Sequence, residues 1–144
     1  MFRKILVAFD GSLYSRRALR LACELAKVYG SKVSVIYVIP DTSPLQEPKS
    51  GLPKPEKGYL EFLKAQGKVI IEGAKQLAKE YGIHVDTEIL EGHPVEKICW
   101  CAKKGRFDLI IMGKRGTNAM RRLGMGSNSE RVARACDENV LIVR

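Results

Sequence analysis

The chain has 144 residues, of which 45% are hydrophobic and 28% are charged, and its formal net charge is +9. This length suits one domain that buries its core without metals or disulfides, and the composition is that of a globular protein. No apolar run approaches the roughly 20 residues that cross a bilayer, and the run from Ile5 to Phe9 is too short for a signal-peptide core. We therefore expect one domain over residues 1–144, located in the cytoplasm and not attached to a membrane.

The N-terminal part of the chain alternates apolar runs with an amphipathic stretch. The short apolar run over 4–9 predicts a strand buried on both faces, and Asp10-Gly11-Ser12 interrupts it. Apolar residues at spacings of three and four then predict a helix that reaches Tyr29, where Gly30 is a natural stop. The run from Lys32 to Val38, rich in valine and isoleucine, predicts a second strand.

The rest of the chain continues the alternation after a break. Residues 40–56 hold five of the six prolines and predict an irregular surface loop. In chain order we then expect a helix over 57–81, a strand over 84–90, a short helix from Pro94, a strand over 109–112, a helix over 128–136 and a last strand over 140–143.

Strands that alternate with helices predict a doubly wound α/β fold, with a parallel sheet and helices on both faces. In such sheets a ligand binds outside the carboxyl ends of the strands, where the strand order reverses. Candidate site residues should therefore follow the first and fourth strands. These are Asp10 and the segment that starts at Gly113.

Glycines recur after the fourth strand at positions 113, 116 and 126, and Ser127 follows the last of them. Glycine lets the backbone approach a ligand closely, and successive backbone N–H groups form an anion-binding concavity. Ser127, Asn128 and Ser129 begin a helix, whose N-terminus favours phosphate. The alternative is a surface loop with a serine that only caps the helix. The position at the end of the fourth strand favours phosphate binding.

Several catalytic motifs are missing from the sequence. There is no P-loop, and no dinucleotide fingerprint follows the first strand. We find no serine with a histidine partner and no carboxylate pair suited to acid–base work. We therefore expect no catalytic residues and no protein-held metal, and at most slow ATP hydrolysis.

The positive charge of the chain has an ordinary interpretation. Lysines on solvated helix faces explain the charge, although it also suits anionic ligands. We do not expect nucleic-acid binding, because aromatic residues do not interleave with the basic ones.

The cysteines also have an ordinary interpretation. Cys99-Trp100-Cys101 is not a redox motif, and no zinc site is completed. We expect all four cysteines to be reduced and buried or half-buried, namely Cys23, Cys99, Cys101 and Cys136.

Three stretches together resemble the universal stress protein family, and the likeness covers essentially the whole chain. They are the run from Ile5 to Ser12, the stretch from Gly92 to Gly113, and the spacing Gly-x2-Gly-x9-Gly-Ser, which is typical of the family's ATP-binding branch. The resemblance implies a Rossmann-like, adenine nucleotide alpha hydrolase-like fold with strand order 3-2-1-4-5. It also implies a stress-response role and a homodimer formed in part by pairing of the last strands.

The resemblance also assigns residues to parts of ATP, which would carry Mg or Mn on its phosphates. Asp10, with Ala8 and Phe9 beside it, would contact the nucleoside and the metal-linked part. The backbone of Val38 would meet the adenine edge, and Met112 and Gly113 would line the ribose. The residues expected around the phosphates are Arg115, Gly116, Gly126, Ser127, Asn128 and Ser129.

The expected function is therefore an ATP-binding regulatory module. Its nucleotide would lie in a cleft between the end of the first strand and the glycine segment. Two alternatives stay open: a slow Mg-dependent ATPase, and a nucleotide-regulated binder of an acidic partner.

Overall fold

The first strand, β1 (Lys4–Ala8), lies in the middle of the sheet, and its residues are apolar toward both faces. Ile5, Leu6 and Val7 are completely buried. Side chains alternate along a strand, so Ile5 and Val7 pack into one apolar cluster and Leu6 packs into another on the opposite face. A strand that is buried on both faces needs helices on both sides of the sheet, as the sequence predicts.

The computed structural model describes residues 2–40, 58–116 and 128–144. After β1 its elements are, in chain order, α1 (Leu13–Tyr29), β2 (Lys32–Pro40), α3 (Tyr59–Glu80), β3 (Val85–Gly92), α4 (Pro94–Lys104), β4 (Leu109–Gly113), α5 (Asn128–Ala135) and β5 (Asn139–Val143).

The five strands form one sheet in the order β3-β2-β1-β4-β5, and each neighbouring pair is parallel. This confirms the expected fold and strand order. The chain leaves β1 toward β2 and β3, and then crosses to β4 and β5 on the other side. The strand order therefore reverses between β1 and β4, where doubly wound sheets bind their ligands.

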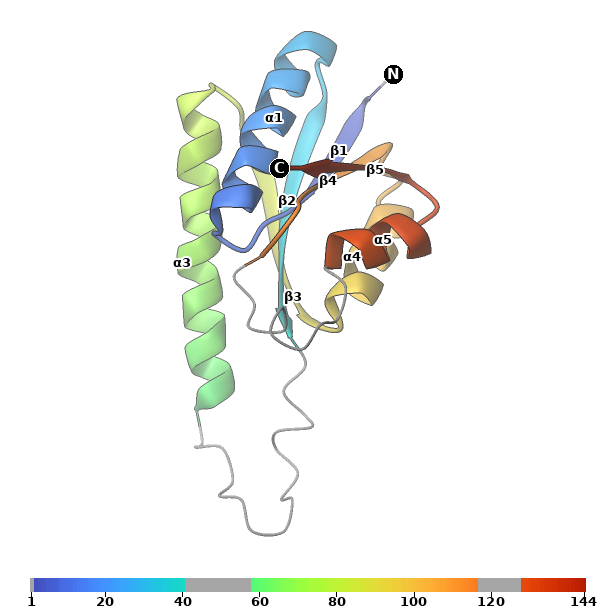
Figure 1. The fold of residues 1–144 in the computed structure, drawn as a ribbon. Helices are drawn as coiled ribbons and strands as arrows, with labels where there is room; N and C mark the ends of the chain where they lie inside the picture. The colour runs from blue at the N-terminus through green and yellow to red at the C-terminus, as the bar shows by residue number, and fades with distance from the viewer. Residues whose placement is uncertain (1, 41–57, 117–127) are drawn as a thin grey trace.

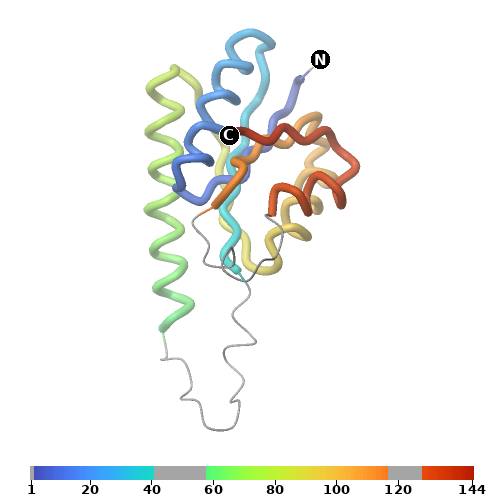
Figure 2. The backbone as a smooth tube through the Cα atoms, viewed as in Figure 1, coloured from blue at the N-terminus to red at the C-terminus, as the bar shows by residue number. Residues whose placement is uncertain are grey.

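Two helical layers cover the sheet (Figure 1). Helices α1 and α3 contact each other over one face, and α4 and α5 contact each other over the other face. Figure 2 shows the same arrangement along the chain path, with both pairs of helices flanking the strands. Because all strands are parallel, their carboxyl ends meet at a single edge of this sandwich.

β3 and β4 extend to Gly92 and Gly113, beyond their predicted ends, and β2 and β5 show two further extensions. β2 continues to Pro40 because Ile39 and Pro40 pair with the end of β3. β5 begins at Asn139, which pairs with Leu109 at the start of β4. Neither extension follows from apolar patterning, because it is the neighbouring strand that sets the length of the ladder. The loop predicted over 40–56 lies, apart from Pro40, outside the described residues.

Candidate functional site

The carboxyl edge of the sheet brings together predicted site residues from three strands. Ala8 ends β1, Val38 lies near the end of β2, and Met112 and Gly113 end β4. Ala8 pairs with Met112 across the β1–β4 contact, so the two candidate segments are adjacent in space. Ala8, Val38 and Gly113 are half-buried and Met112 is buried. The expected meeting of these segments is thus observed.

The turn after β1 is held by hydrogen bonds of its own residues. The Asp10 Oδ1 atom accepts a bond from the Ser12 backbone N–H at 2.9 Å, and Gly11 between them has a φ of 83°. Ser12 caps α1, because its Oγ accepts from the Ser15 backbone N–H at 3.2 Å. The Ser15 Oγ in turn donates to the Ser12 carbonyl at 3.0 Å. This network fixes Asp10 directly beside the first turn of α1.

Gly113 brings the end of β4 into direct contact with the same turn. A Cβ atom at this position would lie 2.6 Å from the Tyr14 carbonyl carbon and 2.8 Å from the Ser15 nitrogen. Both are backbone atoms, which cannot move aside as the end of a long side chain can. The glycine is therefore required for packing, whatever its role toward a ligand.

Hydrogen bonds to the backbone after β4 join the ends of three elements. The Ser12 Oγ lies 3.4 Å from the Arg115 carbonyl, to which it donates from the start of α1. The Ser129 Oγ donates to the Lys114 carbonyl at 3.3 Å from the start of α5. The Lys114 backbone N–H donates to the Val143 carbonyl at 2.7 Å. Residues 114 and 115 thus tie the turn between β1 and α1, the start of α5 and the end of β5 to the end of β4. The junction where β1, β4 and α5 meet is the candidate site.

The predicted phosphate-binding residues differ in their placement. Ser129 is buried, Asn128 is half-buried, and Arg115 and Gly116 are exposed beside Lys114. Gly126 and Ser127 lie outside the described residues. The structure therefore brings the start of α5 to the end of β4, as predicted, and the rest of the glycine spacing stays a prediction.

Phe9 lies beside Asp10, but its side chain points away from the face that carries Ala8. It is only 4% exposed and belongs to the apolar cluster under α1 and α3, whereas Ala8 and Val38 pack on the α4 side. Its backbone N–H is used as well, because it donates to the Ile36 carbonyl at 2.9 Å. Phe9 supports the site through packing, and this arrangement offers no ring surface toward Ala8 or Val38.

Tyr37 is a candidate site residue that the sequence interpretation missed. Burial raises the pKa of its hydroxyl, and the negative charge of Asp10 raises that pKa further. Gly67 on α3 makes room for the ring, since a Cβ there would lie 3.1 Å from it. Only adjacency to Val38 in the sequence could have pointed to Tyr37, and that signal is weak.

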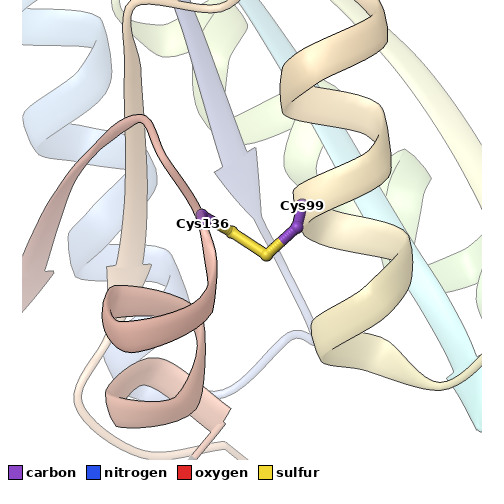
Figure 3. Close-up of a disulfide and its surroundings, with 2 residues drawn as sticks. All are labelled: Cys99 and Cys136. Atoms are coloured by element: carbon purple, nitrogen blue, oxygen red, sulfur yellow. A yellow bond between two sulfur atoms is a disulfide. The ribbon is translucent and has the colours of Figure 1, made fainter.

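The expectation of four reduced cysteines is wrong for one pair. Cys99 and Cys136 form a disulfide between α4 and the residue that follows α5 (Figure 3). The partners are separated by 37 residues, so only the packing of α4 against α5 brings them together. Cys23 and Cys101 are free and buried, as expected. Burial raises the pKa of Cys23 to about 11 and also raises the pKa of Cys101.

The expectation that aromatic and basic residues stay apart also needs correction. Trp100 on α4 is 49% exposed, and the Lys97 and Lys104 ammonium groups lie 5.7 and 4.5 Å from its ring centroid. Residues three and four apart share a helix face, so the three side chains form one surface, hereafter the Trp100 face. The sequence spacing already contained this pattern.

Two features are absent from the described ranges, 2–40, 58–116 and 128–144. Within them, no helix is long and apolar enough to span a bilayer. In the same ranges, no group of three or more histidine, cysteine, aspartate or glutamate side chains is arranged to hold a metal ion.

Comparison with known proteins places the chain in a family. Residues 1–144 match the universal stress protein family. Universal stress protein MJ0531 of Methanocaldococcus jannaschii is 36% identical over 146 residues, covering 100% of this chain and 83% of that protein. Universal stress protein UspA from Lactobacillus plantarum has a TM-score of 0.77 at 25% identity, covering 99% and 98% of the two chains. A universal stress protein from Archaeoglobus fulgidus, solved in complex with dAMP, has a TM-score of 0.72 at 20% identity, covering 99% and 98%. The chain therefore belongs to the universal stress protein family.

Proposed function

We propose that the chain is a regulatory module that binds adenine nucleotide, with ATP as its ligand, at the junction of β1, β4 and α5. The observation that carries the proposal is the pair of serine hydrogen bonds, from Ser12 and Ser129, to the two carbonyls that follow β4. They place the acidic turn of Asp10 and the N-terminus of α5 on either side of one short segment. The A. fulgidus protein with dAMP shares the fold, and at 20% identity that likeness bears on the fold alone.

The residues at the junction suit the two ends of a nucleotide. Val38 and Met112, near the ends of β2 and β4 on either side of β1, provide apolar surface and backbone groups for the base and the ribose. The N–H groups at the start of α5 and the exposed cations of Lys114 and Arg115 suit phosphates. From the sequence alone, Gly116, Gly126 and Ser127 belong to the same phosphate-binding set.

A divalent ion, Mg or Mn, would arrive with the phosphates and neutralise part of their charge. Oxygen ligands are what such ions prefer, and Asp10 supplies a carboxylate in the turn whose Ser12 bonds to the junction. Its Oδ1 atom accepts the Ser12 N–H, which orients the carboxyl group. In this proposal Asp10 orients the metal-linked end of the nucleotide, and the side chains of α5 hold the phosphates.

The test begins with the purified protein, which should release adenine nucleotide when it is heated, extracted and chromatographed. Calorimetric titration with Mg·ATP should then show binding that weakens about 10- to 100-fold in Asp10→Asn, because hydrogen bonds to charged groups contribute about 1.5–3 kcal/mol. Asparagine can still accept the Ser12 N–H, so the turn should persist.

The matched control is Asp86→Asn, which removes an exposed carboxylate near the start of β3, at the opposite edge of the sheet. It should leave the affinity for Mg·ATP unchanged. A nucleotide-free protein with no measurable affinity for ATP, ADP or AMP would overturn the proposed function.

The homodimer through β5 is part of the same proposal. β5 is an edge strand, and Leu141 and Ile142 on it are both 36% exposed. An apolar edge strand offers unpaired backbone N–H and C=O groups and exposed apolar side chains to a second copy of the chain. The Val143 carbonyl of this strand accepts the Lys114 N–H, so pairing at β5 would adjoin the candidate site.

A second candidate function, binding of an acidic partner, is favoured by the Trp100 face. Its tryptophan with two flanking ammonium groups suits a carboxylate-rich protein segment, because tryptophan is enriched at binding hot spots. The ammonium groups of both lysines already lie near the Trp100 ring. Stacking of a nucleobase on this ring is therefore less favoured than ion pairing of the lysines with carboxylates.

Labelled polyglutamate, followed by fluorescence anisotropy, tests this second function. Lys97→Glu/Lys104→Glu should weaken binding at least tenfold, since like charges across an interface cost several kcal/mol. Lys68→Glu/Lys79→Glu changes the net charge equally at exposed positions on α3 and should have a much smaller effect. Equal losses of polyglutamate affinity in both variants would mean that the peptide is held by the net charge alone. Tighter binding of an unstructured oligonucleotide than of polyglutamate would indicate a nucleic-acid partner instead.

A further inference from the structure

The disulfide closes a covalent ring that includes part of the candidate site. Cys99 lies in α4, and Cys136 is the first residue after α5 (Figure 3). The chain between them contains β4, residues 114 and 115, and all of α5. The predicted phosphate-binding residues that the structure describes therefore all belong to the segment whose two ends this one bond ties together, namely Arg115, Gly116, Asn128 and Ser129.

Among the described residues, the buried part of α5 is small. The helix has eight residues, and only Ser129 and Val132 among them are buried. Ser129 bonds to the Lys114 carbonyl, and Val132 packs in the cluster with Leu6 and Ile98. A helix this short is marginal without tertiary support. A covalent link at its C-terminal end is thus a substantial part of what positions it.

We propose that the oxidation state of the Cys99–Cys136 pair regulates nucleotide affinity, by fixing or releasing the helix that carries Asn128 and Ser129. This inference rests on the proposed function. The bond lies about 12 Å from the start of α5, because eight residues rise about 1.5 Å each. A change at one end of a two-turn helix therefore reaches the other end without a relay of side chains.

The chemistry is thiol–disulfide exchange with a cellular or added dithiol. A thiolate of the dithiol attacks one sulfur of the pair, which forms a mixed disulfide and releases the other sulfur as a thiol after it takes up a proton. The second thiol of the reagent then displaces the remaining cysteine. Two electrons and two protons pass from the dithiol to Cys99 and Cys136, and the reagent leaves as its own disulfide.

The other two cysteines are poorly suited to compete in this exchange. Cys23 and Cys101 are buried, and burial keeps both thiols protonated at neutral pH, whereas thiolate is the reactive form. Cys99 and Cys136 are half-buried, so each is partly open to solvent. Exchange at this site should therefore act on one defined pair.

Reduction should weaken nucleotide binding. If the released α5 holds its binding position about one tenth of the time, the apparent affinity falls about tenfold. Calorimetric titration with Mg·ATP, on the full chain before and after reduction with dithiothreitol, measures this ratio. Cys99→Ser/Cys136→Ser should bind like the reduced chain whether or not dithiothreitol is present. Cys101→Ala, which removes a free thiol on the same helix, should keep the response to reduction.

Trp100, the only tryptophan in the chain, adjoins Cys99 and reports on the fold of the reduced protein. An emission spectrum distinct from that of the urea-unfolded chain shows that weaker binding is not global unfolding. Equal affinity of the folded oxidised and reduced forms for Mg·ATP would overturn the inference and leave the proposed function intact. Absence of affinity in both forms would overturn the proposed function itself.

A second measurement tests the inference even if the serine variant does not fold. Coupling between sites is reciprocal, so bound nucleotide must stabilise the disulfide by the same factor. A tenfold coupling corresponds to about 30 mV for a two-electron couple. Redox titration against a dithiothreitol buffer should thus give a lower midpoint potential with saturating Mg·ATP than without it. An unchanged midpoint would contradict the inference.

Discussion

Gly113→Ala is expected to lower the free energy of unfolding by about 3 kcal/mol, near the upper end of the cost of overpacking a core. The added methyl group would lie 2.6 Å from the Tyr14 carbonyl carbon and 2.8 Å from the Ser15 nitrogen. Relief of this clash requires β4 to move away from α1. That movement would also strain the turn of Asp10, whose backbone N–H faces the Ser15 Oγ at 3.4 Å. Urea unfolding, followed by tryptophan fluorescence, measures the loss.

Gly73→Ala is the matched control for this substitution. Gly73 lies inside α3, and beyond the backbone of its own helix a Cβ atom there would meet none of the described atoms within 4 Å. Alanine should stabilise the helix by about 0.5–1 kcal/mol. The two substitutions add the same methyl group, so opposite signs would show that the contact with α1 causes the loss. A Gly113→Ala protein as stable as the wild type would refute the close approach of β4 to α1.

Reduction of the Cys99–Cys136 disulfide is expected to lower the free energy of unfolding by about 4 kcal/mol in the chain-entropy account. The bond spans 37 residues, and opening this ring restores conformational freedom to the unfolded chain. Domains are typically stable by about 5–15 kcal/mol, so the reduced protein should remain folded near room temperature. Urea unfolding with and without dithiothreitol gives the difference.

The double variant Cys99→Ser/Cys136→Ser provides the control for the reductant. Its urea midpoint should match that of the reduced wild type and should not respond to dithiothreitol. Cys23 and Cys101 remain in this variant, so any response to the reagent would have to come from them. A wild-type midpoint that is unchanged by reduction would show that the ring contributes nothing to stability.

Local sequence patterns were enough to predict the elements and the class of the fold. The apolar run over 4–9 required a strand buried on both faces, and Ile5, Leu6 and Val7 are indeed completely buried. Gly30, predicted to end the first helix, has a φ of 68°, which glycine adopts without strain. These features depend on neighbours along the chain, which is why they can be read from sequence. The strand order came from the family resemblance.

The sequence also predicted which segments would meet at one edge of the sheet, because the carboxyl ends of parallel strands lie there whatever their side chains. It could not determine which groups touch there. The contact of Gly113 with Tyr14, the burial of Phe9 on the α1 side and the effect of Asp10 on the pKa of Tyr37 arise between segments far apart in the chain. The Cys99–Cys136 bond is the clearest case, since it exists only because α4 packs against α5. Such contacts depend on the packing of whole elements, and that information is absent from any local pattern.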